Sequence, residues 1–116
     1  MSRLLLLLLL LPGALTAHAT AFTPVDQRRL DAAPTDGSNW LAHGRDQQES
    51  RFSPLDQVNT GNLARLRLDW YVDLPDTRGL QATPLVADGV MYMTGNWSVA
   101  RAYDASDGAL LWEYDP

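Results

Sequence analysis

The fold is decided by residues 78–112, RGLQATPLVADGVMYMTGNWSVARAYDASDGALLW, in which short apolar runs alternate with turn residues. Asp88-Gly89 lies between two such runs and predicts a two-residue β-hairpin, because this pair readily adopts positive φ angles. Asp104–Gly108 predicts a second tight turn, since Asp can bond nearby backbone and Gly can take a positive φ. Both signals predict an antiparallel meander.

Four strands of this meander are expected in succession. They are Pro84–Ala87, Val90–Thr94, Ser98–Tyr103 and Leu110–Tyr114. The spacing from Ala102 and Asp104 through Gly108 to Trp112 is typical of propeller blades that lock together, with Trp112 in a packed position. A single sheet with two apolar faces needs cover on both. The sequence therefore predicts an all-β fold, the first blade of a β-propeller that is incomplete here.

Residues 66–116 are expected to form this blade. Apolar and polar side chains alternate over Leu66–Val72, which predicts an additional, earlier strand that pairs with a distant last blade. Residues 22–65 are expected to be irregular, with short helical turns. One is a helix over Val25–Ala33, with Thr23 as its cap and Pro24 at its first position. Another lies at Thr60–Leu63.

Residues 1–21 have the pattern of a signal peptide. Arg3 precedes an unbroken leucine run, Leu4–Leu11, and a small-residue stretch follows with Ala17-x-Ala19. Cleavage is expected after Ala19 or Ala21. An uncleaved anchor is the less favoured alternative, because the run is too short to span a bilayer. The mature chain is thus expected to be periplasmic, without a stable membrane span.

Composition excludes several classes of function. Acidic residues outnumber basic ones, 14 to 9, and no basic cluster is present, so nucleic-acid binding has no electrostatic support. The chain has no cysteine, which excludes disulfides, a lipoprotein anchor and thiolate metal sites within it. His43 stands without a second ligand at metal-binding spacing and is interpreted as structural. Asp104 and Asp107 are interpreted as turn formers rather than calcium ligands.

A set of motifs resembles the start of quinoprotein alcohol dehydrogenases, the enzymes that use pyrroloquinoline quinone (PQQ). The resemblance covers nearly all of residues 38–116. The motifs are Trp40-Leu41-x-x-Gly44-Arg45, Arg51-Phe52-Ser53-Pro54-Leu55, Asn62-Leu63-x-x-Leu66 and Arg78-Gly79-Leu80-Gln81-Ala82-Thr83-Pro84-Leu85-Val86. The Trp112 spacing resembles the blade-closing tryptophan motif of the same family.

The resemblance implies an eight-bladed propeller with PQQ on its axis and calcium or a lanthanide beside it. The full-length enzyme would oxidise primary or secondary alcohols by hydride transfer to PQQ and pass electrons to a periplasmic cytochrome c or another acceptor. The catalytic and metal-binding residues, and a haem c domain where one exists, would lie downstream, so this chain alone is expected to be inactive. The alternative is a cofactor-free propeller, acting as a scaffold or binding module in outer-membrane assembly.

One cofactor contact maps onto this chain. It is Gln81, directly before Ala82-Thr83-Pro84, at a position that is normally glutamate in the family and lies close to the carboxylates of PQQ. An amide both donates and accepts hydrogen bonds, and it removes a negative charge that would face an anionic ligand. The competing interpretation of Gln81 is a plain loop residue before a strand.

Overall fold

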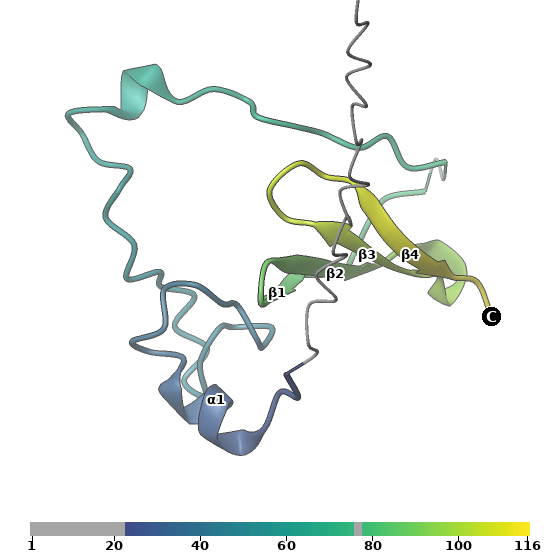
Figure 1. The fold of residues 1–116 in the computed structure, drawn as a ribbon, viewed down its shortest axis with the longest axis horizontal. Helices are drawn as coiled ribbons and strands as arrows, with labels where there is room; N and C mark the ends of the chain where they lie inside the picture. The colour runs from purple at the N-terminus through teal and green to yellow at the C-terminus, as the bar shows by residue number, and fades with distance from the viewer. Residues whose placement is uncertain (1–22, 76–77) are drawn as a thin grey trace, which may run out of the picture.

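The computed structural model describes residues 23–75 and 78–116 and contains one four-stranded antiparallel sheet, in the order β1-β2-β3-β4 (Figure 1). The strands are β1 (Leu85–Ala87), β2 (Val90–Thr94), β3 (Ala100–Asp104) and β4 (Leu110–Tyr114). The helical elements are α1 (Gln27–Ala32) and the 3₁₀ turns η1 (Leu63–Arg65) and η2 (Asn96–Ser98). The predicted all-β meander is confirmed. The predicted signal peptide lies outside the described residues.

Both predicted tight turns form at the same end of the sheet. Asp88 and Gly89 connect β1 to β2 with φ angles of 52° and 79°, as a type I′ hairpin requires. Asp104–Gly108 connects β3 to β4, and the Asp104 carboxylate accepts hydrogen bonds from the Ser106 amide and hydroxyl. Gly108 has a φ of 76°. The Ala105 amide donates to the Gly89 carbonyl over 2.8 Å, which ties the two turns together.

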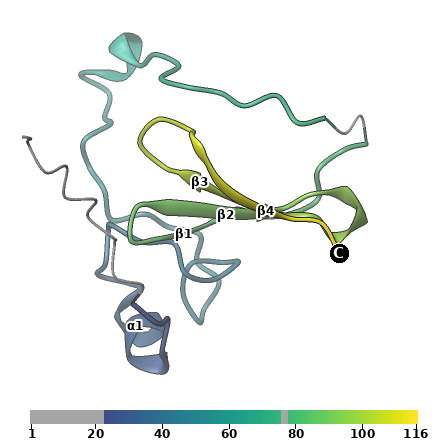
Figure 2. The same cartoon turned by 45° about the vertical axis from the view of Figure 1, so that its right-hand side comes forward.

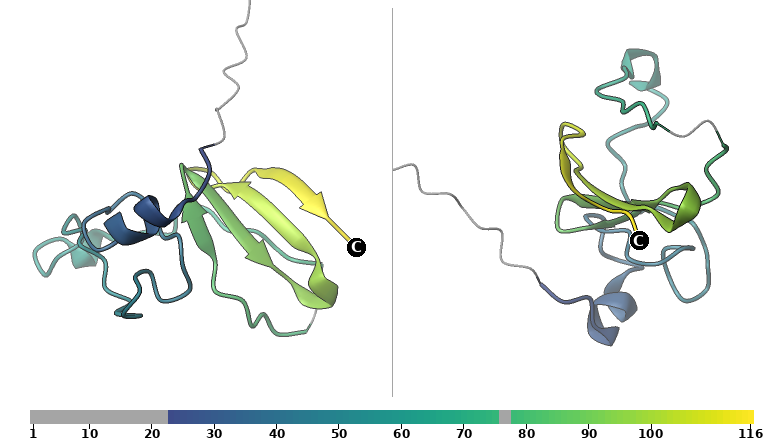
Figure 3. Two further views of the ribbon diagram at one scale, coloured as in Figure 1. Left: turned by 90° about the horizontal axis from the view of Figure 1, so that it is seen from below. Right: turned by 90° about the vertical axis from the view of Figure 1, so that its right-hand side faces the viewer.

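The buried residues of the sheet belong mainly to β3. Ala102 and Tyr103 are almost fully buried, and Val99 just before the strand is also buried. Ala102 lies between Tyr92 of β2 and Trp112 of β4, and the β3–β4 register shifts directly after this pair. All five residues of β4 are exposed, so this strand is the open edge of the sheet (Figure 3).

The opposite edge is covered by the amino-terminal segment. Trp40 exchanges two backbone hydrogen bonds with Val86 of β1, at 2.8 and 2.9 Å. Arg45, 1% exposed, lies near the Trp40 ring and donates to the Asp36 carbonyl over 2.9 Å. Figure 3 shows the segment that carries α1 on the β1 side of the sheet. The irregular segment is therefore attached to the sheet rather than independent of it.

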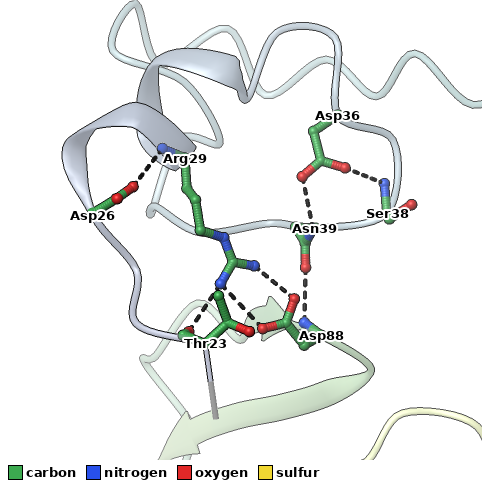
Figure 4. Close-up of polar contacts among 7 residues, drawn as sticks. All are labelled: Thr23, Asp26, Arg29, Asp36, Ser38, Asn39 and Asp88. Atoms are coloured by element: carbon green, nitrogen blue, oxygen red, sulfur yellow. Dashed lines mark hydrogen bonds and ion pairs between the residues drawn. The ribbon is translucent and has the colours of Figure 1, made fainter. Parts of the chain in front are cut away.

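A polar cluster fixes this segment to the β1–β2 turn (Figure 4). The Arg29 guanidinium forms a two-pronged ion pair with the Asp88 carboxylate, at 2.7 and 3.1 Å. The Asn39 side chain accepts from the Asp88 amide and donates to Asp36. The Asn39 bond and the Ser38 amide lower the pKa of the Asp36 carboxyl below its ordinary value.

Three predictions of local structure need correction. No strand forms over Leu66–Val72, where Figure 2 shows a long loop that carries η1 at its far end. Alternation supplies two faces, but a strand also needs a neighbour for its backbone groups, and none of the described strands pairs with it. The third strand begins at Ala100, since η2 occupies Asn96–Ser98. The helix begins later than predicted, because Asp26 caps it by accepting from the Arg29 amide.

Candidate functional site

The candidate site is a hollow at the end of the sheet opposite the two tight turns. It has a volume of about 340 Å³. We call it the Gln81 hollow; its lining residues are Gln81, Ala82, Thr94, Gly95, Asn96 and Trp97. In an antiparallel meander the start of β1 and the end of β2 lie at the same end of the sheet. The chain entering β1 and the chain leaving β2 therefore meet here, and Gln81 is exposed at their junction.

The turn after β2 is an unusual connection. The Gly95 amide donates to the Val99 carbonyl over 2.7 Å, which closes the loop and returns the chain into β3. Within it Trp97 and Ser98 have φ angles of 60° and 63°. Residues other than glycine adopt this left-handed backbone conformation at a cost in free energy, and such strain is found preferentially at functional sites. Trp97 remains 71% exposed.

This turn holds the segment that carries Gln81. The Asn96 side-chain amide donates to the Arg78 carbonyl over 3.0 Å. The Arg78 guanidinium lies over the Trp97 ring, 4.7 Å from its centroid, a cation–π geometry. Both contacts are made by Arg78, three residues before Gln81, so they anchor the start of the segment that leads to Gln81.

A partly buried ion pair supports the same end of the sheet. Arg101 of β3 is 7% exposed and pairs with Glu113 of β4 over 2.6 Å. A Cβ on Gly95 would lie 3.0 Å from the Arg101 guanidinium, so this arginine lies directly against the turn. A side chain at position 95 would require this guanidinium to shift by a few tenths of an ångström.

The lining of the Gln81 hollow suits recognition rather than proton transfer. Its polar side chains are neutral: the amides of Gln81 and Asn96 and the hydroxyl of Thr94. Amide N–H and hydroxyl groups can donate to an anionic oxygen, whereas none of these groups is a base near neutral pH. Within residues 23–75 and 78–116, no group of three or more His, Cys, Asp or Glu side chains is placed to hold a metal ion.

Other residues singled out in the sequence have structural surroundings. His43 Nε2 lies 2.8 Å from the Arg51 guanidinium on the surface. Asp107 accepts from the Ala109 amide, which places it, like Asp104, in turn formation. Trp70 donates to the Ala105 carbonyl over 3.2 Å and covers the β3–β4 turn.

The packed position of Trp112 against a neighbouring blade stays a prediction, because the described residues form one sheet. Trp112 contacts the Tyr92 ring, 6.2 Å between centroids, and is still 46% exposed. Its only ring contact in the described part of the chain comes from its own sheet, since no second sheet lies over it there.

The sequence singles out Gln81, and its role as a site residue stays a prediction; the contacts of Asn96 and Trp97 with Arg78 were not predicted. Gly95-Asn96 was predicted only to end the second strand, and the third strand was predicted to begin at Ser98. The Gly95-Asn96 pair signals a turn, but no local pattern shows that the turn contacts a segment 18 residues earlier.

Comparison with known proteins agrees with this geometry. Residues 40–116 match the family model described as the β-propeller domain of glucose/ethanol/alcohol dehydrogenases. This match spans the amino-terminal contact with β1, the Gln81 hollow and all four strands. The chain belongs to this family of PQQ-type propellers.

Members of the PQQ family with assigned activities are similar to this chain. The dehydrogenase subunit of the quinone alcohol dehydrogenase of Komagataeibacter europaeus is 56% identical over 78 residues, which are 67% of this chain and 11% of that protein. Quinohemoprotein alcohol dehydrogenase ADH IIB of Pseudomonas putida is 48% identical over 111 residues, 96% of this chain and 16% of that protein. The chain thus spans between a tenth and a sixth of these relatives.

A solved member of the PQQ family has the same fold. Quinohemoprotein alcohol dehydrogenase ADHIIG from Pseudomonas putida HK5 superposes with a TM-score of 0.76 at 49% identity. The aligned part covers 79% of this chain and 14% of that structure. This chain therefore has the fold of one part of that structure's propeller.

Proposed function

We propose that the complete protein containing this chain is an exported, periplasmic, PQQ-dependent alcohol dehydrogenase. It oxidises primary or secondary alcohols, and this chain supplies the first propeller blade and one edge of the cofactor site. PQQ, when bound, supplies the chemistry of a hydride acceptor. The contribution of this chain is binding and orientation, because its candidate site offers hydrogen-bond donors and no base. The chain alone is expected to be inactive.

The observation that carries the proposal is the position of Gln81. It is exposed at the end of the sheet where the chain enters β1, in a hollow with a neutral polar lining. Such a lining fits the carboxylates of PQQ, because amide and hydroxyl groups donate to anionic oxygens without adding a negative charge. Gln81 would donate through its side-chain amide, and Thr94 offers a hydroxyl in the same hollow.

The remaining components are placed outside this chain. The resemblance assigns the calcium or lanthanide ligands and the general base to the rest of the protein. Haem c is supported by the quinohemoprotein relatives, and a cytochrome c or another acceptor would receive the electrons. Export rests on the sequence of residues 1–21. In the described residues, no helix has the length and apolar character needed to cross a membrane.

The open edge and the half-exposed Trp112 support a role for β4 in packing against a second blade. All of β4 is exposed, and unpaired strand edges are usually covered or paired in native proteins. We expect the following blade of the complete protein to cover Trp112.

The test is a reconstitution titration of the cofactor-free complete protein with PQQ. A hydrogen bond to a charged group contributes about 1.5–3 kcal/mol, so Gln81→Ala is expected to weaken PQQ affinity by about ten- to a hundredfold. Gln57→Ala changes an exposed glutamine that does not line the hollow; it serves as the matched control and is expected to leave affinity unchanged. Equal affinities for both variants would show that Gln81 is a loop residue. No PQQ binding by the unmodified protein would favour the scaffold alternative.

A further inference from the structure

We propose that Asn96 and Trp97 are positioning residues that hold residues 78–81 and thereby orient Gln81 toward the hollow. The cofactor role of Gln81 in this inference rests on the proposed function. The contacts of Asn96 and Trp97 with Arg78 are present whether or not Gln81 binds the cofactor. Neither residue needs to touch the cofactor for its effect.

The two contacts converge on one residue from two directions. The Asn96 amide bonds the Arg78 carbonyl over 3.0 Å, which fixes the backbone. The Trp97 ring lies 4.7 Å from the Arg78 guanidinium, which fixes the side chain. Arg78 is thus held at both ends by consecutive residues of a single turn. Gln81 follows three residues later and lines the same hollow as both Asn96 and Trp97.

The strained conformation of the turn explains how consecutive residues reach one target. Successive side chains of an extended strand point to opposite faces, so two neighbours rarely contact the same residue. Positive φ at Trp97 and Ser98 breaks that alternation. The turn is fixed in this form by the Gly95–Val99 backbone bond and by Arg101 against Gly95. Trp97 is 71% exposed in this chain, and its ring contacts the Arg78 guanidinium.

Trypsin provides a test that needs no cofactor, since it cleaves the bond after arginine. Cleavage between Arg78 and Gly79 requires Arg78 to leave the Trp97 ring and the Asn96 amide. The rate follows the population of the open segment when opening is fast. In the cofactor-free complete protein, Asn96→Ala is expected to accelerate cleavage at this bond by about two- to tenfold, the effect of one hydrogen bond. Fragments are assigned by mass spectrometry.

Two controls separate the contact from a general loosening of the protein. Cleavage after the exposed Arg65 is the internal reference and is expected to stay constant in every variant. Ser98→Ala changes an exposed residue of the same turn and is expected to leave the rate at Arg78 unchanged. Trp97→Leu should accelerate cleavage and Trp97→Phe should largely restore it, because only the latter keeps an aromatic face. Unchanged cleavage at Arg78 in both Asn96→Ala and Trp97→Leu would overturn the inference.

A double-mutant cycle then connects the contact to the cofactor. Asn96→Ala is expected to weaken PQQ affinity by about two- to tenfold, and to have no further effect once Gln81→Ala is present. Additive effects of the two substitutions would overturn the positioning role, because Asn96 would then act independently of Gln81. Faster cleavage at Arg78 in Asn96→Ala, with unchanged affinity in Gln81→Ala, would instead refute the cofactor contact of the proposed function and leave the hold on residues 78–81 intact.

Discussion

Replacing Gly108 by alanine is predicted to weaken the β3–β4 turn through two separate effects. Gly108 has a φ of 76°, and an alanine in this left-handed conformation costs about 1–2 kcal/mol. The added Cβ would also lie 2.5 Å from Cε3 of Trp70, closer than real Cβ contacts occur. The indole must therefore move.

Movement of the indole raises the total cost. Trp70 donates from Nε1 to the Ala105 carbonyl over 3.2 Å, and loss of this bond adds about 0.5–1.5 kcal/mol. The predicted loss for Gly108→Ala is thus about 1.5–3.5 kcal/mol. Gly89→Ala is the matched control, because Gly89 has a φ of 79° but no atom within 4 Å of its added Cβ. It should lose only the first term, about 1–2 kcal/mol.

Hydrogen exchange in the complete protein measures both losses locally. The amides of Asp104 and Gly108 donate to carbonyls within the β3–β4 turn, those of Ala109 and Asp104, so their exchange reports its opening. Gly108→Ala should accelerate their exchange by about ten- to three-hundredfold, and Gly89→Ala should accelerate exchange in its own turn by about five- to thirtyfold. When Trp70 is replaced by leucine, the acceleration caused by Gly108→Ala should come closer to that caused by Gly89→Ala. Equal acceleration by the two glycine variants would refute the argument that Trp70 requires glycine at position 108.

Two further predictions concern the polar contacts at this end of the sheet. Arg29→Ala removes the two-pronged ion pair with the half-exposed Asp88 and should destabilise the attachment of the amino-terminal segment by about 1 kcal/mol. Hydrogen exchange of the amides in the Trp40–Val86 bridge should then be roughly fivefold faster. Arg28→Ala should have no effect, because that side chain is 90% exposed. The hydroxyl and amide of Ser106 lower the pKa of Asp104 from its ordinary value of 3.8. The stability that the Asp104 carboxylate gives to the turn is therefore fully present above pH 3.8 and is lost as the pH falls through the lowered pKa. Asp104→Asn should therefore reduce the loss of turn stability at acidic pH, measured by tryptophan fluorescence. The same pH dependence in the variant and the unmodified protein would contradict a stabilising role for the Asp104 carboxylate.

Local chemistry explains which parts of the fold could be predicted. Asp88-Gly89 and Asp104–Gly108 specify their turns within a few residues, and both formed as predicted. Leu66–Val72 has an equally regular pattern but forms no strand. Its backbone would need a partner strand, which the pattern of the segment itself cannot supply. The predicted domain boundary at residue 66 remains a prediction.

The same distinction applies to the candidate site. Gln81 could be singled out from its motif, four residues before the strand that begins at Leu85. Its contacts could not, because Asn96 and Arg78 are brought together by the hairpin geometry and by a turn with positive φ at residues other than glycine. No sequence pattern predicts that Trp97 adopts such a conformation, since bulky residues rarely do.

The most direct test of the central claim is an experimental structure of the complete protein with PQQ bound. The account predicts that the sheet of this chain forms a blade with its Gln81 end toward the cofactor. The Gln81 amide should donate to a PQQ carboxylate oxygen at about 2.7–3.2 Å. A PQQ molecule bound beyond hydrogen-bond reach of Gln81, or bound at the end of the sheet that carries Asp88 and Gly108, would contradict it.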